Sequence, residues 1–374
     1  MPFQNSVFTK VPGSVIDIPV KVRTDPNRQN RWGWLFIIPT DVRRAWSSRM
    51  FTKFALSVGA ILILVALGCG SPAPSILFTS DTDGNLEIYS INANGEKLTN
   101  LTNTRTHEFA PVVSPNRRLV SFLSGVPGDT AVEVMRIDGT ERSRLTHSSA
   151  EHSSQRWSPS NDRIAYVKND GANSNIYVTL VSEEKTALLT SIAGYQVGGW
   201  SSDGNSVAFT VQSGPDQGIY IRNPDGVNEY RVTDALDYNP IWSPDSRQLA
   251  FLSTRDKNAE VYIMDADGGN LKRLTESDAP EYHLSWSPNG QSLLFVSERD
   301  GNPEIYTVTK EGARPTRLTF NTIVDNQPVW SPGGKQIAFV SYLDGDADIF
   351  LMSADGKSQN RLTNNSAQDT NPAW

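Results

Sequence analysis

Cysteine is almost absent from this chain of 374 residues: its single copy is Cys69, so no intramolecular disulfide can form. Negative charge outweighs positive charge outside the N-terminal part. Residues 1–68 hold nine Lys and Arg against three Asp and Glu, so the overall charge of −7 leaves −13 for residues 69–374. Since phosphate groups bind to basic surfaces, this balance argues against nucleic acid as the main ligand. Cations, basic peptides and neutral glycans remain as ligand classes.

Long apolar runs are missing too. No charged residue occurs between Phe54 and Ser80, but only residues 54–67 are mostly apolar, which is short for a membrane span. Four basic residues precede this run (Arg43, Arg44, Arg49 and Lys53), and Ala66-Leu67-Gly68-Cys69 ends it. A basic region, a short apolar region and small residues are typical of an export signal.

The end of this segment resembles a bacterial lipoprotein signal, in which Cys69 would become the lipidated N-terminus. Ala66 stands where that pattern prefers Leu. An uncleaved N-terminal anchor helix is the alternative, and either arrangement predicts an extracytoplasmic, membrane-anchored protein, periplasmic or on the cell surface. Because Met50 stands where a signal would begin, residues 1–49 are a disordered basic extension or a mis-assigned start, and residues 50–69 the signal or anchor.

One motif recurs through the rest of the chain. Its clearest copy is residues 240–275, and its Trp-Ser-Pro anchor begins at Val113, Trp157, Trp200, Trp242, Trp286, Trp330 and Trp374. The anchors are 42 to 44 residues apart. A period in the forties, built from short strands and turns, is the signature of a β-propeller with one blade per repeat.

The incomplete first and last copies indicate how the propeller closes. Each copy contains four short runs separated by turn residues, and seven fourth runs centre on Leu-Thr or Val-Thr. The copy that starts at Ile76 lacks its Trp strand, and residues 371–374 supply only that strand. We therefore predict an all-β fold for residues 75–374: a seven-bladed β-propeller of four-stranded antiparallel blades. The C-terminal strand joins the N-terminal three, so the ring leaves no sheet edge open.

The repeated elements P-x-W-S-P-D-G, I-A-F-x-S, I-Y, D-G and R-L-T resemble the WD-like propeller repeat of TolB and its relatives, which include the propellers of prolyl-oligopeptidase-type peptidases. The resemblance covers residues 75–374 and implies an extracytoplasmic propeller that binds proteins or other ligands on one face. TolB itself resembles a six-bladed propeller behind a separate α/β domain, and such a peptidase would need a Gly-x-Ser-x-Gly elbow. Neither is found here, so a Tol-system role and a serine peptidase are not expected.

Polar residues recur five positions before each anchor: Glu108, His152, Tyr195, Asp237, Glu281, Asp325 and Asp369. They are expected on the face that carries the connections between blades. One interpretation is local: such residues accept hydrogen bonds from the backbone of their own blade. The other is a ligand-binding acidic ring around the channel mouth, which would attract a Lys- or Arg-bearing partner or a hard cation such as Ca²⁺.

Histidine offers a second candidate site. The four copies, His107, His147, His152 and His283, are predicted in the connecting segments, outside strands. Imidazole with carboxylate suits a transition metal, and some propeller lyases that act on uronic-acid sugars resemble this, which makes His107, His152 and His283 candidate ligands. However, no local pair such as His-x₃-His exists.

The sequence thus favours a monomeric, non-enzymatic binding module without a catalytic residue or resident cofactor. Its expected partner is a protein or a cell-envelope ligand, and nucleic acid is not expected. The alternative is a metal-dependent polysaccharide lyase or hydrolase that uses the His-bearing loops.

Overall fold

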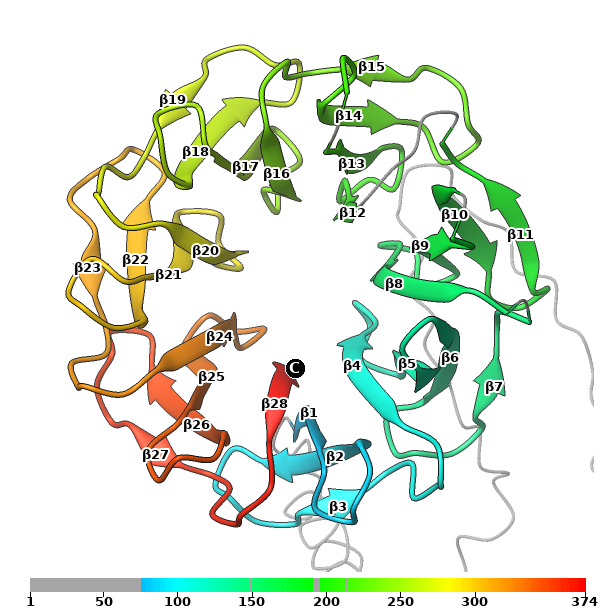
Figure 1. Ribbon diagram of the computed structural model, residues 1–374, viewed down its shortest axis with the longest axis vertical. Coiled ribbons are helices and arrows are strands. Elements are labelled where there is room, and N and C mark those ends of the chain that lie inside the picture. The colour runs from blue at the N-terminus through cyan, green and yellow to red at the C-terminus, as the bar shows by residue number, and fades with distance from the viewer. Residues whose placement is uncertain (1–74, 148, 172, 191–195, 213) are drawn as a thin grey trace, which may run out of the picture. The chain divides into compact units, whose positions relative to one another are not determined.

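The structure, a computed structural model, describes residues 75–147, 149–171, 173–190, 196–212 and 214–374. Within these ranges, 28 strands form seven four-stranded antiparallel sheets arranged around one axis (Figure 1). No helix among the described residues is long and apolar enough to cross a membrane. The predicted seven-bladed propeller is confirmed. The predictions for residues 1–69, including Cys69, and for Tyr195 lie outside the described residues.

The blades follow one another along the chain. Blade 1 contains β1 (Ser75–Ser80), β2 (Glu87–Asn92), β3 (Thr99–Asn100) and β28 (Thr370–Ala373); blade 2 contains β4 (Glu108–Val113), β5 (Leu119–Val126), β6 (Asp129–Arg136) and β7 (Ser143–Arg144). Blade 3 contains β8 (Glu151–Trp157), β9 (Arg163–Asn169), β10 (Ser174–Leu180) and β11 (Lys185–Leu188); blade 4 contains β12 (Gln196–Trp200), β13 (Val207–Val211), β14 (Gly218–Arg222) and β15 (Tyr230–Arg231). Blade 5 contains β16 (Asp237–Trp242), β17 (Gln248–Ser253), β18 (Glu260–Asp265) and β19 (Lys272–Arg273); blade 6 contains β20 (Glu281–Trp286), β21 (Ser292–Ser297), β22 (Glu304–Thr309) and β23 (Thr316–Arg317). Blade 7 contains β24 (Asp325–Trp330), β25 (Gln336–Ser341), β26 (Asp348–Ser353) and β27 (Asn360–Arg361).

Blade 1 is assembled from both ends of the described chain. Its sheet order is β28-β1-β2-β3, with Leu77 opposite Ala373 and Thr79 opposite Thr370. The last strand thus occupies the innermost place that β4, β8, β12, β16, β20 and β24 hold in the other blades (Figure 1). This confirms the predicted closure of the ring by the C-terminal strand.

The core lies between blades. The second strands are the most apolar, and their central side chains are fully buried because a neighbouring blade covers each sheet face. The repeated tryptophans fasten these interfaces: the indoles of Trp157, Trp242 and Trp286 each donate to a backbone carbonyl of the preceding blade at 3.0 to 3.2 Å. Fully burying a large apolar side chain stabilises the fold by roughly 1.5–3 kcal/mol.

The innermost strands carry a repeated irregularity. Their pairing shifts register at a bulge, and in six of them a non-glycine residue within the bulge has φ near +50°: Ala110, Ser154, Asn239, His283, Gln327 and Asn371. Bulges redirect side chains. In β12, Gly198 occupies the bulge because a Cβ there would lie 2.2 Å from the carbonyl oxygen of Pro240.

The turns alternate between two faces of the ring. The connection face holds the second-to-third turns and the connections to the next blade. The anchor face holds the Ser-Pro-type turns and the third-to-fourth hairpins. On the connection face, Asn258 donates from Nδ2 to the carbonyls of Ser277 and Ala279, at 3.0 and 2.8 Å, so turn and connection support each other. Asn85 makes the same type of bond to the Thr106 carbonyl, at 2.7 Å.

Candidate functional site

The predicted ring is present but buried. Its six described members are at most 1% exposed: Glu108, His152, Asp237, Glu281, Asp325 and Asp369. Five of them lie at the start of an innermost strand, and Asp369 directly precedes β28. As placed, these groups interact with protein atoms of their own and neighbouring blades. Whether the ring binds a ligand stays a prediction.

Arginines form ion pairs with three of these carboxylates. Glu108 pairs with Arg142 at 2.8 Å, Asp237 with Arg255 at 2.7 Å and Glu281 with Arg299 at 2.7 Å. Asp325 and Asp369 instead receive bonds from asparagine side chains, Asn321 at 2.7 Å and Asn365 at 3.2 Å. Burial raises the pKa of both aspartates, because the described part of the chain offers them no ion pair.

A second set of buried carboxylates faces the ring from the preceding blade. It begins the third strands: Glu87, Glu260, Glu304 and Asp348, all at most 1% exposed. Glu260 and Glu304 accept backbone N–H groups of the connection, from Ser277 at 2.8 Å and Asn321 at 3.1 Å. These residues therefore support the connection between blades. The repeated pattern of an acidic residue, Ile or Val, and then Tyr or Phe could have revealed them.

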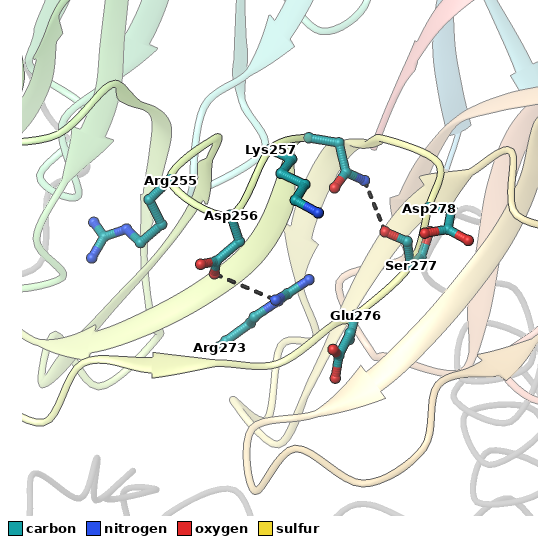
Figure 2. A pocket seen from close by; sticks show the side chains of 8 residues that line it. Arg255, Asp256, Lys257, Arg273, Glu276, Ser277 and Asp278 are labelled. Atoms are coloured by element: carbon teal, nitrogen blue, oxygen red, sulfur yellow. Dashed lines mark hydrogen bonds and ion pairs between the residues drawn. The ribbon is translucent and has the colours of Figure 1, made fainter.

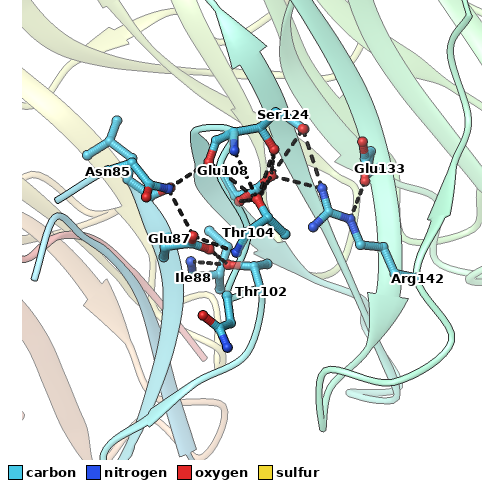
Figure 3. A network of polar contacts seen from close by, with 12 residues as sticks. Asn85, Glu87, Ile88, Thr102, Thr104, Glu108, Ser124, Glu133 and Arg142 are labelled. Atoms are coloured by element: carbon cyan, nitrogen blue, oxygen red, sulfur yellow. Dashed lines mark hydrogen bonds and ion pairs between the residues drawn. The ribbon is translucent and has the colours of Figure 1, made fainter. Parts of the chain in front are cut away.

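The two sets meet in pairs at four consecutive interfaces: blades 5/6, 6/7, 7/1 and 1/2. Figure 3 shows the pair Glu87 and Glu108, where Thr104 contributes its backbone N–H to Glu87, at 2.7 Å, and its hydroxyl to Glu108, at 2.8 Å. Burial raises the pKa of Glu87. For Glu108 burial acts the same way, but bonds from Thr106 and Arg142 outweigh it and lower the pKa.

The pair Glu260 and Glu281 shows the strongest perturbation. Burial, followed by contact with Glu260, raises the pKa of Glu281 to about 7. Burial also opposes ionisation of Glu260, but bonds from Glu281 and Thr275 lower its pKa. The proton that the pair retains toward neutral pH therefore resides mainly on Glu281.

At two of the remaining interfaces the preceding blade offers no second acid. Opposite His152 the third strand carries Ala131, and opposite Asp237 it carries Gly218. Burial lowers the pKa of His152, whose Nδ1 contacts the Thr130 carbonyl and whose ring packs on Tyr166 at 5.5 Å. At the first of these interfaces an imidazole thus replaces the ring carboxylate, whereas at the second Asp237 is retained and pairs with Arg255.

The candidate metal ligands are not brought together. Nδ1 of His107 accepts the backbone N–H of Leu86 at 3.2 Å, His152 is buried between blades, and His283 lines the channel. Among the described residues, no group of three or more His, Cys, Asp or Glu side chains is placed to hold a metal ion. The expectation that the histidines lie outside strands is wrong for His152 in β8 and His283 in β20, because both strands extend to the bulge and beyond it.

A charged pocket of about 670 Å³ opens on the connection face of blade 5 (Figure 2). It lies between the 254–259 turn and the 274–280 connection, with Lys257, Glu276 and Asp278 on its wall. Arg273 joins its two sides, reaching Asp256 at 3.4 Å and Glu260 at 2.8 Å. In blade 6, Arg317 makes the equivalent contacts with Asp300 and Glu304. Arg273 is therefore part of the repeated blade structure and is not specific to this pocket.

A second cavity, of about 570 Å³, lies in the central channel and is lined by residues of β4, β8, β20, β24 and β28, among others. Five of the six bulge residues line it: Ala110, Ser154, His283, Gln327 and Asn371. Nδ1 of His283 lies 2.5 Å from Oδ1 of Asn326, and burial lowers the pKa of this histidine. Most polar side chains of the channel wall are those of Ser, Gln and Asn, so its polar groups are mainly hydroxyls and amides. The repeat pattern did not reveal them, because the bulge was not predicted.

Comparisons with known proteins agree with this geometry. A family model described as the TolB beta propeller domain matches residues 129–255 and 200–341, which together span more than half of the chain. TolB from Acinetobacter baumannii is 19% identical, with a TM-score of 0.54, over 77% of this chain and 78% of that one.

Two other solved structures have the same fold. An oligogalacturonate lyase in complex with manganese is 16% identical, with a TM-score of 0.60, over 74% of this chain and 85% of that one. The β-propeller domain of the Trilobed protease from Pyrococcus furiosus is 12% identical, with a TM-score of 0.60, over 78% and 95%. At such identities the likeness concerns the fold alone. The match to the family model goes further: this chain belongs to the TolB β-propeller domain family.

Proposed function

We propose that this protein is an exported, lipid-anchored propeller that binds a protein or a cell-envelope ligand on its connection face. The observation that carries this proposal is the charge of the loops there. Outside the buried ring, the described connection-face loops hold twelve Asp and Glu residues and four Lys and Arg residues. The described anchor-face loops hold thirteen Asp and Glu residues and nine Lys and Arg residues. Such a surplus attracts a basic partner and speeds its association.

The exposed carboxylates, and not the buried ring, are the groups that a partner can reach. Glu276 and Asp278 are exposed at the charged pocket and have no ion pair among the described residues. Six of the seven outermost strands contain only two residues, which leaves little edge for pairing with a second copy. This supports a monomeric receptor for a different molecule.

Charge reversal on the two faces tests this surface. Glu276→Lys/Asp278→Lys should weaken capture of the partner by in-cell crosslinking at least ~10-fold, since like charges then face each other. The matched control is Glu183→Lys/Glu184→Lys, an equal change in an anchor-face hairpin. Equal capture by both variants would contradict binding at the connection face.

Anchoring has a separate test. Cys69→Ala should move the protein from the membrane fraction to the soluble fraction and abolish labelling with a radioactive or clickable fatty acid. A variant that stays in the membrane unlabelled would instead support an uncleaved anchor helix. Because this experiment does not involve the connection face, its outcome leaves the binding proposal unaffected.

A further inference from the structure

One residue of the channel departs from its six counterparts. Arg156 immediately precedes the anchor in β8, and the same position in the other innermost strands holds Val112, Gly199, Ile241, Ser285, Val329 and Ala373. It is the one Lys or Arg in the seven innermost strands that the structure describes. Ile241 and Val329 pack against apolar clusters between blades. A guanidinium at this position is therefore not required by the fold.

Arg156, which is partly buried, also lacks the carboxylate partner that Arg142, Arg255 and Arg299 have. Its one hydrogen bond to a described residue runs from Nη1 to the carbonyl of the adjacent Gln155, at 2.9 Å, and no described carboxylate lies within ion-pair distance. Burial lowers the pKa of Arg156, whereas carboxylate partners raise those of Arg142 and Arg273. A guanidinium that is partly withdrawn from water and has no carboxylate partner is destabilising, and a bound anion would compensate its charge.

The cavity around Arg156 suits an anion. No Asp or Glu occurs in the lining that the structure describes, although the chain as a whole is acidic. Arg156 is the single Lys or Arg in this lining, and the lowered pKa of His283 disfavours a second positive charge there. Ser153, Ser154 and Gln327 add hydroxyl and amide groups for the neutral parts of a ligand.

We propose that the central channel binds a carboxylate-bearing ligand through Arg156. A guanidinium binds a carboxylate with two parallel hydrogen bonds. One fixed positive charge balances one monoanion, whereas a phosphate dianion would keep an uncompensated charge. A volume of about 570 Å³ lies within the range of ligand sites and accommodates the end of an extended polar chain. This site is separate from the connection face and does not depend on the function proposed for it.

The carboxylate could come from a peptide C-terminus or from an acidic sugar, and calorimetry with paired probes distinguishes them. The peptide arm compares Gly-Ser-Asn-Gly as the free acid with its C-terminal amide. The sugar arm compares digalacturonate with its methyl ester. In at least one arm the charged form should bind at least ~10-fold more tightly than the neutral form, and inorganic phosphate should compete poorly.

Arg156→Val is the decisive variant, because it installs the residue found at the same position in blades 2 and 7. Binding of the charged probe should fall at least ~10-fold, while the thermal midpoint stays equal or rises. Arg163→Gln, an exposed arginine in the adjacent strand β9, is the control and should leave binding unchanged. The proposal is overturned if no charged probe binds the wild type at millimolar concentration, if acid and neutral forms bind alike, or if Arg156→Val binds normally.

Discussion

Glu260 of blade 5 and Glu281 of blade 6 share one hydroxyl group, that of Thr275, at 2.6 and 3.1 Å from their respective Oε2 atoms. The same oxygen accepts the backbone N–H of Val261 at 2.8 Å. A hydroxyl carries a single hydrogen, so it can donate to one of these carboxylates only. The other contact requires a proton on a carboxyl group, and the raised pKa of Glu281 assigns that proton to it.

This shared proton predicts that stability falls as pH rises. The pKa of Glu281 increases from 4.5 to about 7 on folding, so the folded protein binds more protons between these values. The contribution is fully present below pH ~4.5 and is lost as pH rises through about 7; between pH ~5 and ~8 the free energy of unfolding should decrease by roughly 1–3 kcal/mol. The charged groups that face Glu281 are Glu260 and Arg299.

Urea unfolding at pH ~5 and pH ~8 measures this decrease in the free energy of unfolding. Glu281→Gln keeps a hydrogen-bond donor toward Thr275 but removes the titrating carboxyl group. The free energy of unfolding should therefore depend less on pH, and the dependence that remains comes from the other carboxylates of raised pKa. Glu276→Gln is the control, since this side chain is exposed and lies in the connection after Arg273. An unchanged pH dependence in Glu281→Gln would contradict the assignment of the proton.

Asp237 predicts a contrasting behaviour, because its neighbour in the preceding blade is Gly218 and no second acid shares a proton with it. Its ion pair is with Arg255, at 2.7 Å. Arg255→Ala would leave the buried side chain of Asp237 without its ion pair and should cost about 2–4 kcal/mol. Arg299→Ala should cost less at pH ~5 than at pH ~8, because Glu281 can take up a proton.

Chemical denaturation of both variants checks this difference. Arg255→Ala/Asp237→Asn should recover most of the loss, because it removes the unpaired charge. Lys257→Ala, an exposed change in the same turn, should stay within ~0.5 kcal/mol of the wild type. If the double variant were no more stable than Arg255→Ala, lost packing of Arg255 on Tyr262, at 5.0 Å, would be the better explanation.

The scaffold could be predicted well from the sequence because the repeat samples one blade seven times. The anchors at Trp157 to Trp374 indicated the period, and the incomplete copies indicated the closure. The burial of the ring residues was not predicted, because spacing alone does not show whether Glu281 points to solvent or toward Glu260. Arg156 escaped notice because one basic residue is informative only once the fold places it in a channel without carboxylates.

The tryptophans allow a matched comparison of hydrogen bonding. Trp286 and Trp374 are both 9% exposed, but Trp286 donates to the Ile241 carbonyl at 3.2 Å, whereas Nε1 of Trp374 has no partner among the described residues. Trp286→Phe should therefore lower the free energy of unfolding by about 1 kcal/mol more than Trp374→Phe. Thermal and urea unfolding measure the two losses. Equal losses would mean that packing alone determines the role of these indoles.

Closure of the ring gives the last prediction. Removal of residues 370–374 would expose the edge of β1 and open the apolar cluster to which Trp374 belongs. Exposed edges pair with other chains, so the truncated protein should aggregate and lose its cooperative unfolding transition. Light scattering and calorimetry measure both effects.

A rearranged chain provides the matched control for this truncation. Residues 370–374 followed by a copy of the turn 331–335, inserted before Ser75, should restore a soluble monomer, because β28 would then reach β1 as the first strand reaches the second in blade 7. Failure of this chain to fold would show that pairing of β28 with β1 is not sufficient to close the propeller.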